Sequence, residues 1–135
     1  MPAIRRQINI AASPRAVWRA LTTSEGLARW WDPDVRMDGR EGGRIVVGAE
    51  DTAQARGMVH TWRPTSHLEL SFDKGGASEW RGSHVAFKLA RDADESRLTM
   101  VHSGGEALED EARRKTLEGQ WDRALVALQT ALDEP

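Results

Sequence analysis

The feature that most constrains the fold is residues 106–135, which read as one long amphipathic helix. Its apolar residues recur at helical spacing and form one stripe about 100° wide: Leu117, Trp121, Ala124, Leu125, Leu128 and Leu132. Acidic residues gather at the start of the segment, which suits the positive end of a helix dipole. A stripe of this length can cover one whole face of a sheet, so the rest of the chain is expected to supply that sheet.

The first third of the chain predicts one strand followed by two short helices. Ile4, Ile8 and Ile10 alternate with period two, although Arg6 falls on the same face. The segment "SPRAVWRALTTSEGLARWW", residues 13–31, then has helical spacing. Ser13 is a suitable N-cap with proline after it, Thr23 or Ser24 can cap a second helix, and Pro33 ends that helix.

The middle of the chain predicts strands joined by short turns. Residues 32–50 contain turn residues around two short strands, and the turn "RPTS" joins two more strands within residues 55–76. A further hairpin follows in residues 79–105, turning at "RDADES". Consecutive strands with short turns form an antiparallel sheet with one face covered. We therefore predict an α+β fold with about six to seven strands, in a single domain over residues 1–135.

Composition excludes several classes of site and partner. The chain has no cysteine and a net charge of −2, so we expect no disulfide, no cysteine-ligated metal, no nucleic-acid partner and no membrane association. The histidines lack the H-x3-5-H spacing of zinc ligands, and we expect no metal and no cofactor. The opening residues lack the apolar run of a secretory signal, so a cytoplasmic location is expected.

Four segments together resemble a known family. They are "SPRAVWRALTTSEGLARWW", "RGMVHTWRPTSHLELSF", "SRLTMVHSGG" and "GQWDRALVAL". Their pattern resembles the START-like (SRPBCC, Bet v-type) superfamily, and within it the homologues of the activator of heat-shock-protein ATPase. The resemblance implies a helix-grip fold, in which a curved sheet wraps the last helix and a cavity lies between them. Members include carriers of hydrophobic ligands, cyclases and chaperone-linked modules, so the fold does not choose the function.

The resemblance and the strand alternation together suggest a ligand site. We expect a cavity that binds a small hydrophobic molecule, since tryptophan and methionine offer large, adaptable apolar surfaces. Its expected lining, with Arg114 near the mouth, is Trp31, Met58, His60, Trp62, Phe72, Phe87, Met100, His102, Arg114, Leu117, Trp121 and Leu125. The charged start of the helix stripe at Asp110 and Arg114 fits either a cavity mouth or an end that protrudes into solvent.

Two other functions stay open. One is a protein-interaction module that contacts a chaperone through exposed apolar residues. The other is an enzyme of the cyclase or hydratase type, in which His60 or His102 acts as a general base. No nucleophile elbow, phosphate loop or dinucleotide fingerprint is present, so binding is favoured over catalysis. The sequence is compatible with a monomer or a homodimer.

The adjacent pair Trp30 and Trp31 predicts a division of roles. Trp30 continues the inward face that Leu27 begins, whereas Trp31 lies about 100° away, beside the Pro33 stop. We predict that Trp30 is core and that Trp31 lies at the cavity mouth or on a partner surface. Trp80 and His84 alternate opposite to Val85, so either that strand is bulged or both lie on the outer face of the sheet.

Overall fold

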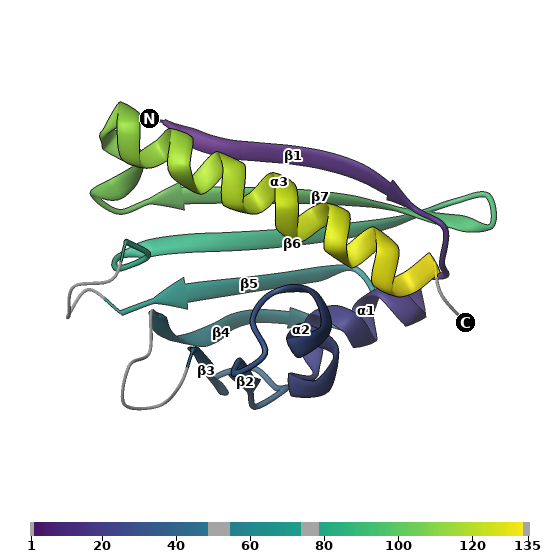
Figure 1. Ribbon diagram of the computed structural model, residues 1–135. Coiled ribbons are helices and arrows are strands. Elements are labelled where there is room, and N and C mark those ends of the chain that lie inside the picture. The colour runs from purple at the N-terminus through teal and green to yellow at the C-terminus, as the bar shows by residue number, and fades with distance from the viewer. Residues whose placement is uncertain (1, 49–54, 74–78, 134–135) are drawn as a thin grey trace.

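The computed structural model describes residues 2–48, 55–73 and 79–133, and these form a seven-stranded antiparallel sheet with helices on one face (Figure 1). The strand order is β1-β7-β6-β5-β4-β3-β2. The strands are β1 (Ala3–Ile10), β2 (Arg36–Met37), β3 (Arg44–Val47), β4 (Ala55–Arg63), β5 (His67–Phe72), β6 (Ser83–Asp92) and β7 (Glu95–Gly104). Strands β2 to β7 lie side by side in chain order, as short turns between antiparallel strands require. The first strand, β1, pairs with the last, β7. The expected fold class is confirmed.

The helices begin at the caps that the sequence offered. α1 spans Pro14–Thr22, and the Ser13 hydroxyl accepts a hydrogen bond from the Ala16 amide at 3.2 Å. α2 spans Ser24–Trp30 and is capped by Thr23, whose hydroxyl accepts from the Gly26 amide at 2.9 Å. The last elements are η2 (Ala107–Glu109) and α3 (Glu111–Asp133). Figure 1 shows α3 running diagonally across the sheet, from the start of β1 towards α1.

The core lies between the sheet and α3. The helix buries Leu117, Trp121, Leu125 and Leu128, which belong to the predicted stripe. Facing them, Phe87 and Met100 are at most 1% exposed. Arg6 shares the inner face of β1, but its guanidinium reaches Asp122 at 2.7 Å and Glu118 at 3.5 Å, both on α3. An arginine is tolerated there because its partners lie along the exposed side of the helix.

A β-bulge in β4 changes which side chains face the core. Val59 pairs with Leu70, but the next pair is Thr61 with Glu69, so His60 is the extra residue. Before the bulge Met58 points outwards and is 45% exposed, and His60 is exposed as well. After the bulge Trp62 pairs with the buried Leu68 and turns inwards. The expectation that Met58 and His60 line the space under the helix is therefore wrong.

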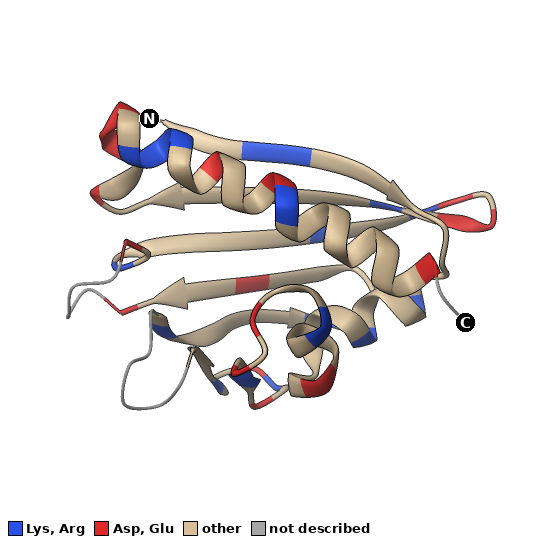
Figure 2. Cartoon of the chain, in the orientation of Figure 1, with Lys and Arg blue, Asp and Glu red and all other residues tan. Residues whose placement is uncertain are grey.

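Charged residues of both signs are interleaved along α3 and the loops, while the middles of β5 to β7 carry few of them (Figure 2). Ion pairs join several of these charges, such as Asp92 with Arg97 at 2.9 Å in the β6–β7 hairpin. Within the described residues, no helix combines the length and apolar content needed to cross a membrane.

Candidate functional site: a tryptophan-lined pocket beside the long helix

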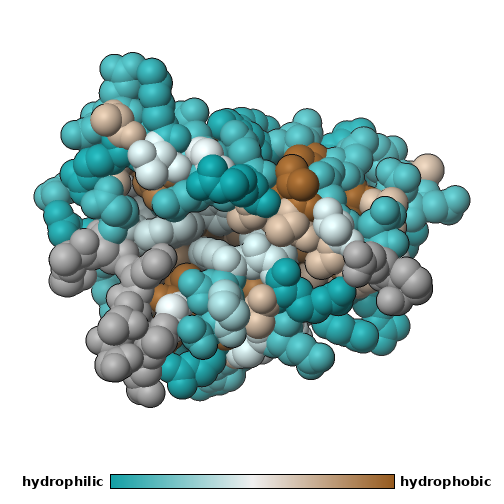
Figure 3. All heavy atoms as spheres, viewed as in Figure 1, coloured by the Kyte–Doolittle hydropathy of each residue, from teal (hydrophilic) through white to brown (hydrophobic). Residues whose placement is uncertain are grey.

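A pocket of about 400 Å³ opens between the end of α2, β3 and the middle of α3. Its lining comprises four tryptophans, three small apolar residues and three polar residues: Trp30, Trp31, Trp80, Trp121, Val47, Ala124, Ala127, Asp32, Gln120 and Arg123. Figure 3 shows the surface hollowed between α3 and the elements below it. The volume lies within the range of roughly 300–1,000 Å³ that small-molecule sites occupy.

Trp31 is the point where the tryptophans of the pocket meet. Its ring stacks on Trp30 with centroids 5.5 Å apart, and it lies 5.6 Å from both Trp80 and Trp121. Trp30 is fixed because its indole N–H donates to the Ala20 carbonyl at 2.9 Å, and it is 4% exposed. Trp30 is thus a core residue, as predicted. Trp31 is partly buried and forms part of the pocket lining.

A buried chain of hydrogen bonds lies behind the pocket and centres on His102. The Trp121 indole N–H donates to His102 Nδ1 at 3.0 Å, so Nδ1 carries no proton. His102 Nε2 must then carry the proton and donate to the Ser83 hydroxyl, 2.8 Å away. The Ser83 hydroxyl in turn donates to the Trp80 carbonyl. Each polar group in this series of hydrogen bonds has a partner while His102 is neutral.

Burial, and next the charge of His84, lowers the pKa of His102 to about 4. Protonation would also place two N–H groups face to face, at His102 Nδ1 and the Trp121 indole, which the present arrangement forbids. The imidazole therefore has no free nitrogen with which to take a proton from a ligand in the pocket. This geometry favours a structural role for His102 over the role of a general base.

Trp80, which forms one wall of the pocket, lies in the turn before β6 and not in the strand itself. Trp80 is 8% exposed and its ring stacks on His102 with centroids 4.6 Å apart. His84, which lies within β6, is on the outer face and its Nδ1 lies 3.1 Å from the Ser71 hydroxyl. His84 therefore lies on the outer face, which is one of the two alternatives left open by the alternation. Trp80 is buried instead, because it precedes the strand.

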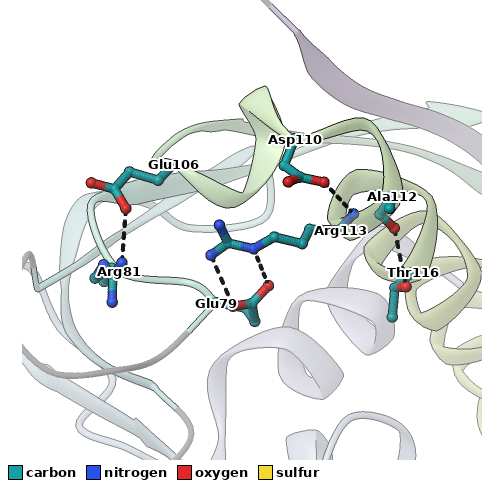
Figure 4. A network of polar contacts seen from close by, with 7 residues as sticks. All are labelled: Glu79, Arg81, Glu106, Asp110, Ala112, Arg113 and Thr116. Carbon is teal, nitrogen blue, oxygen red and sulfur yellow. Dashed lines mark hydrogen bonds and ion pairs between the residues drawn. The ribbon is translucent and has the colours of Figure 1, made fainter.

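Two ion pairs hold this turn against the start of α3 (Figure 4). The Arg113 guanidinium donates to both carboxylate oxygens of Glu79 at 2.8 and 2.9 Å, and Arg81 donates to Glu106 at 2.8 Å. The pairing with Arg113 lowers the pKa of Glu79, and the pairing with Arg81 lowers that of Glu106. Gly105 permits this approach, since its φ is +81° and an added Cβ would lie 2.8 Å from the Arg81 carbonyl.

The residues expected in the site fall into three groups. Trp31 and Trp121 line the pocket, and Phe72 and His102 contact Trp80 from behind, with Phe72 and Trp80 centroids 5.3 Å apart. A second set is buried in the core without lining this pocket: Phe87, Met100, Leu117 and Leu125. The third group lies away from the pocket and comprises Met58, His60, Trp62 and Arg114.

Two of the distant residues have partners of their own. Trp62 packs edge-on against Trp18, with centroids 5.1 Å apart. Arg114 donates to the Leu108 carbonyl at 2.8 Å, so it fastens η2 to α3 and is not part of the pocket lining. Met58 and His60 lie on the outer face, as described above. Within the described segments, no group of three histidine or carboxylate side chains is placed to hold a metal ion.

The expected site included none of the polar and small residues of the pocket, nor Trp80: Asp32, Val47, Gln120, Arg123, Ala124, Ala127 and Trp80. Ala124 stood on the predicted stripe, but as a packing residue. A usable signal was the small size of Ala124 and Ala127 beside Trp121, since alanine leaves space next to a large ring. Trp80 could not be placed, because its role depends on how the turn packs.

The family described as "Activator of Hsp90 ATPase homolog 1-like protein" matches residues 11–133. The chain belongs to this family. Among solved structures, the Aha1 dimer from Colwellia psychrerythraea is similar, with 25% identity, a TM-score of 0.84, and coverage of 99% of this chain and 98% of that one. The fold agrees with the START-like superfamily that the sequence resembles.

Two other structures share the fold at lower identity. Protein MLL2253 from Mesorhizobium loti has 20% identity and a TM-score of 0.80, covering 97% of this chain and 96% of that one. CalU16 from Micromonospora echinospora has 22% identity and a TM-score of 0.77, covering 98% of this chain and 76% of that one. Among curated proteins, none matches the sequence well enough to count as a relative.

Proposed function

We propose that this member of the family binds a small, largely apolar molecule with an aromatic ring in the tryptophan-lined pocket. The observation that carries the proposal is the presence of four indole side chains on one pocket of about 400 Å³. Indole faces and edges favour flat aromatic partners, with about 0.5–1.5 kcal/mol per ring pair beyond the apolar area buried.

The polar residues of the pocket define the rest of the ligand. Asp32, Gln120 and Arg123 are the polar members of a lining that is otherwise apolar. A hydroxyl or carbonyl on one edge of the ligand could pair with Gln120 or Arg123 while the ring lies against the indoles. A long aliphatic chain fits less well, because the pocket lies beside the aromatic cluster and not along the length of α3.

The arrangement of His102 supports binding over catalysis. Its two ring nitrogens are engaged by Trp121 and Ser83, at 3.0 and 2.8 Å. His60, the other histidine considered as a base, lies on the far face of the sheet beside Thr61. Neither histidine presents a free nitrogen to the pocket.

The experiment is a titration of 15N-labelled protein with 2-naphthol, an uncharged aromatic probe, with 1-decanol as the aliphatic comparison. The six indole N–H signals give an internal control, since four tryptophans line the pocket whereas Trp18 and Trp62 form a separate pair. We expect saturable shifts of the four signals with 2-naphthol. Equal shifts at Trp18 and Trp62, or no saturable shift at all, would overturn the proposal.

A pair of variants tests the location. Ala127→Leu places a larger side chain in the pocket and is expected to weaken 2-naphthol binding at least tenfold. Val126→Leu is the matched control, because Val126 directly precedes Ala127 on α3, is 59% exposed and is not part of the pocket lining. Equal binding by the wild type and Ala127→Leu would show that the probe binds elsewhere.

A second candidate function follows from the family and from the Aha1 similarity: a protein-interaction module that acts on an Hsp90-type ATPase, as a monomer or a homodimer. Its test is the ATP hydrolysis rate of purified Hsp90 with and without this protein, together with the sedimentation of the protein alone. An unchanged rate would remove this candidate and leave the pocket proposal standing. For both candidates we propose a cytoplasmic location, supported by the absence of cysteine.

A further inference from the structure

We infer that Trp80 is a movable wall of the pocket, held in place by the ion pairs Glu79–Arg113 and Arg81–Glu106, and that these pairs tune ligand affinity without touching the ligand. The inference deepens the proposed function, since it describes regulation of the same pocket. The two ion pairs are called the clasp below.

Trp80 lies between the pocket and the buried hydrogen bonds of His102. One face of its ring stacks on His102 with an interplanar angle of 22°, and the residue also contributes to the pocket lining. Trp121 lies 5.4 Å from it, measured between ring centroids, and donates its indole N–H to His102. A displacement of Trp80 would therefore join the pocket to His102, to the Trp121 indole N–H and to Ser83.

The clasp acts on both neighbours of Trp80. Glu79 and Arg81 each bind a residue in the segment 106–113, and Figure 4 shows both pairs reaching from the turn to that segment. Adjacent side chains along an extended or turning chain point in different directions. Because Glu79 and Arg81 are held outwards, against Arg113 at the start of α3 and Glu106 before η2, Trp80 is kept directed inwards.

The clasp is suited to opening because it is exposed to solvent. The side chains of Glu79 and Arg113 are 49% and 35% exposed, and those of Glu106 and Arg81 are 75% and 30% exposed. Exposed ion pairs are weak and are screened by salt, with a Debye length of about 10 Å at 0.1 M. Ionic strength can thus weaken the contacts of the two residues beside Trp80, whereas the backbone after Trp80 is anchored by the Ser83 amide, which donates to the Trp80 carbonyl at 3.0 Å.

A ligand-free experiment tests the wall directly. The double variant Glu79→Gln/Arg81→Gln removes one charge from each pair and leaves the net charge unchanged. We expect hydrogen exchange at the Trp121 indole N–H to accelerate about fivefold, which corresponds to about 1 kcal/mol at 1.4 kcal/mol per tenfold. The matched control is Asp92→Asn/Arg97→Gln, which removes an ion pair of similar length in the β6–β7 hairpin and should leave that exchange unchanged.

The second part of the experiment varies the salt concentration. Raising NaCl from about 20 mM to about 500 mM should accelerate Trp121 exchange in the wild type and not in the clasp variant. If exchange in the clasp variant matches the wild type at low salt, the movable wall is refuted, even where 2-naphthol binds. If exchange accelerates as expected and 2-naphthol fails to bind, the wall is supported and the proposed ligand is rejected.

The affinity arm uses the uncharged 2-naphthol. Its dissociation constant should change with salt in the wild type and stay constant in the clasp variant, because the clasp and not the probe carries the charges. An equal salt dependence in both proteins would contradict the role of the clasp in affinity.

Discussion

The neutral state of His102 leads to a quantitative prediction about stability and pH. In the folded chain the pKa of His102 is about 4, against an ordinary value of 6.5, because the side chain is buried among Trp80, Trp121 and Ser83. Between these two values the unfolded chain binds more protons than the folded chain. Stability must therefore fall as the pH drops from about 6.5 to about 4, and this contribution is constant below that window.

The magnitude follows from the difference between the two values. A gap of about 2.5 pH units corresponds to about 3 kcal/mol when the whole window is crossed. At pH 5 the loss relative to pH 7.5 is about 2 kcal/mol. That is a large share of the roughly 5–15 kcal/mol of net stability that folded domains have.

The assay is urea unfolding at pH 7.5 and pH 5, followed by tryptophan fluorescence. The perturbation is His102→Gln, which removes the titrating ring and keeps an acceptor and donors of similar reach. We expect the pH-dependent loss to be about 2 kcal/mol smaller in the variant than in the wild type. Carboxylates such as Glu79 titrate in both proteins, so their contribution cancels in the difference. His60→Gln, on the exposed outer face, is the control and should behave as the wild type.

If His102→Gln does not fold, the titration of His102 can be measured directly by NMR in the wild type. The ring-proton resonances of His102 in the wild type should not titrate between pH 7.5 and about 5. A titration midpoint near 6.5 for His102 would refute the reasoning, as would an identical pH dependence of stability in the wild type and the variant.

Three further predictions concern unfolding free energies measured in urea. Gly105→Ala should destabilise the protein by about 1–3 kcal/mol, because its positive φ and the close Arg81 carbonyl exclude a Cβ. Gly119→Ala should instead stabilise it by up to about 1 kcal/mol, because an added Cβ on α3 would make only an ordinary contact with Arg123 at 3.6 Å. Equal effects of the two substitutions would contradict this account. Thr23→Ala should cost about 1 kcal/mol through loss of the α2 cap, and an unchanged midpoint would show that the cap contributes nothing. Leu128→Ala should cost about 2–5 kcal/mol, since Leu128 is fully buried, and a loss below about 1 kcal/mol would contradict its place in the core.

Helical periodicity made the end of the chain predictable. Leu117, Trp121, Leu125 and Leu128 are buried as their spacing indicated, because a long window of period 3.6 leaves little ambiguity about the inward face. The caps at Ser13 and Thr23 were predictable for a similar reason, since capping depends on local side-chain chemistry.

The face of the sheet on which each strand residue lies was less predictable, as β4 shows. A period of two places Met58, His60 and Trp62 on one face, but the extra residue at His60 reverses the faces beyond it. A bulge of this kind leaves no mark in the alternation of apolar residues, since all three side chains have apolar parts. The same limit applies to Trp80, which the alternation counted as a strand residue although the strand begins at Ser83.

The six tryptophans acquire distinct roles once the contacts are considered together. Trp18 and Trp62 form a separate edge-on pair, whereas the other four meet around Trp31. Phenylalanine could supply the apolar area at Trp121, but it could not donate the N–H that fixes His102 as a neutral donor to Ser83. An imidazole locked in this way stabilises the wall of the pocket and has no capacity left for proton transfer. These hydrogen bonds therefore support the proposal that the pocket binds a molecule, because they leave His102 without a nitrogen for proton transfer.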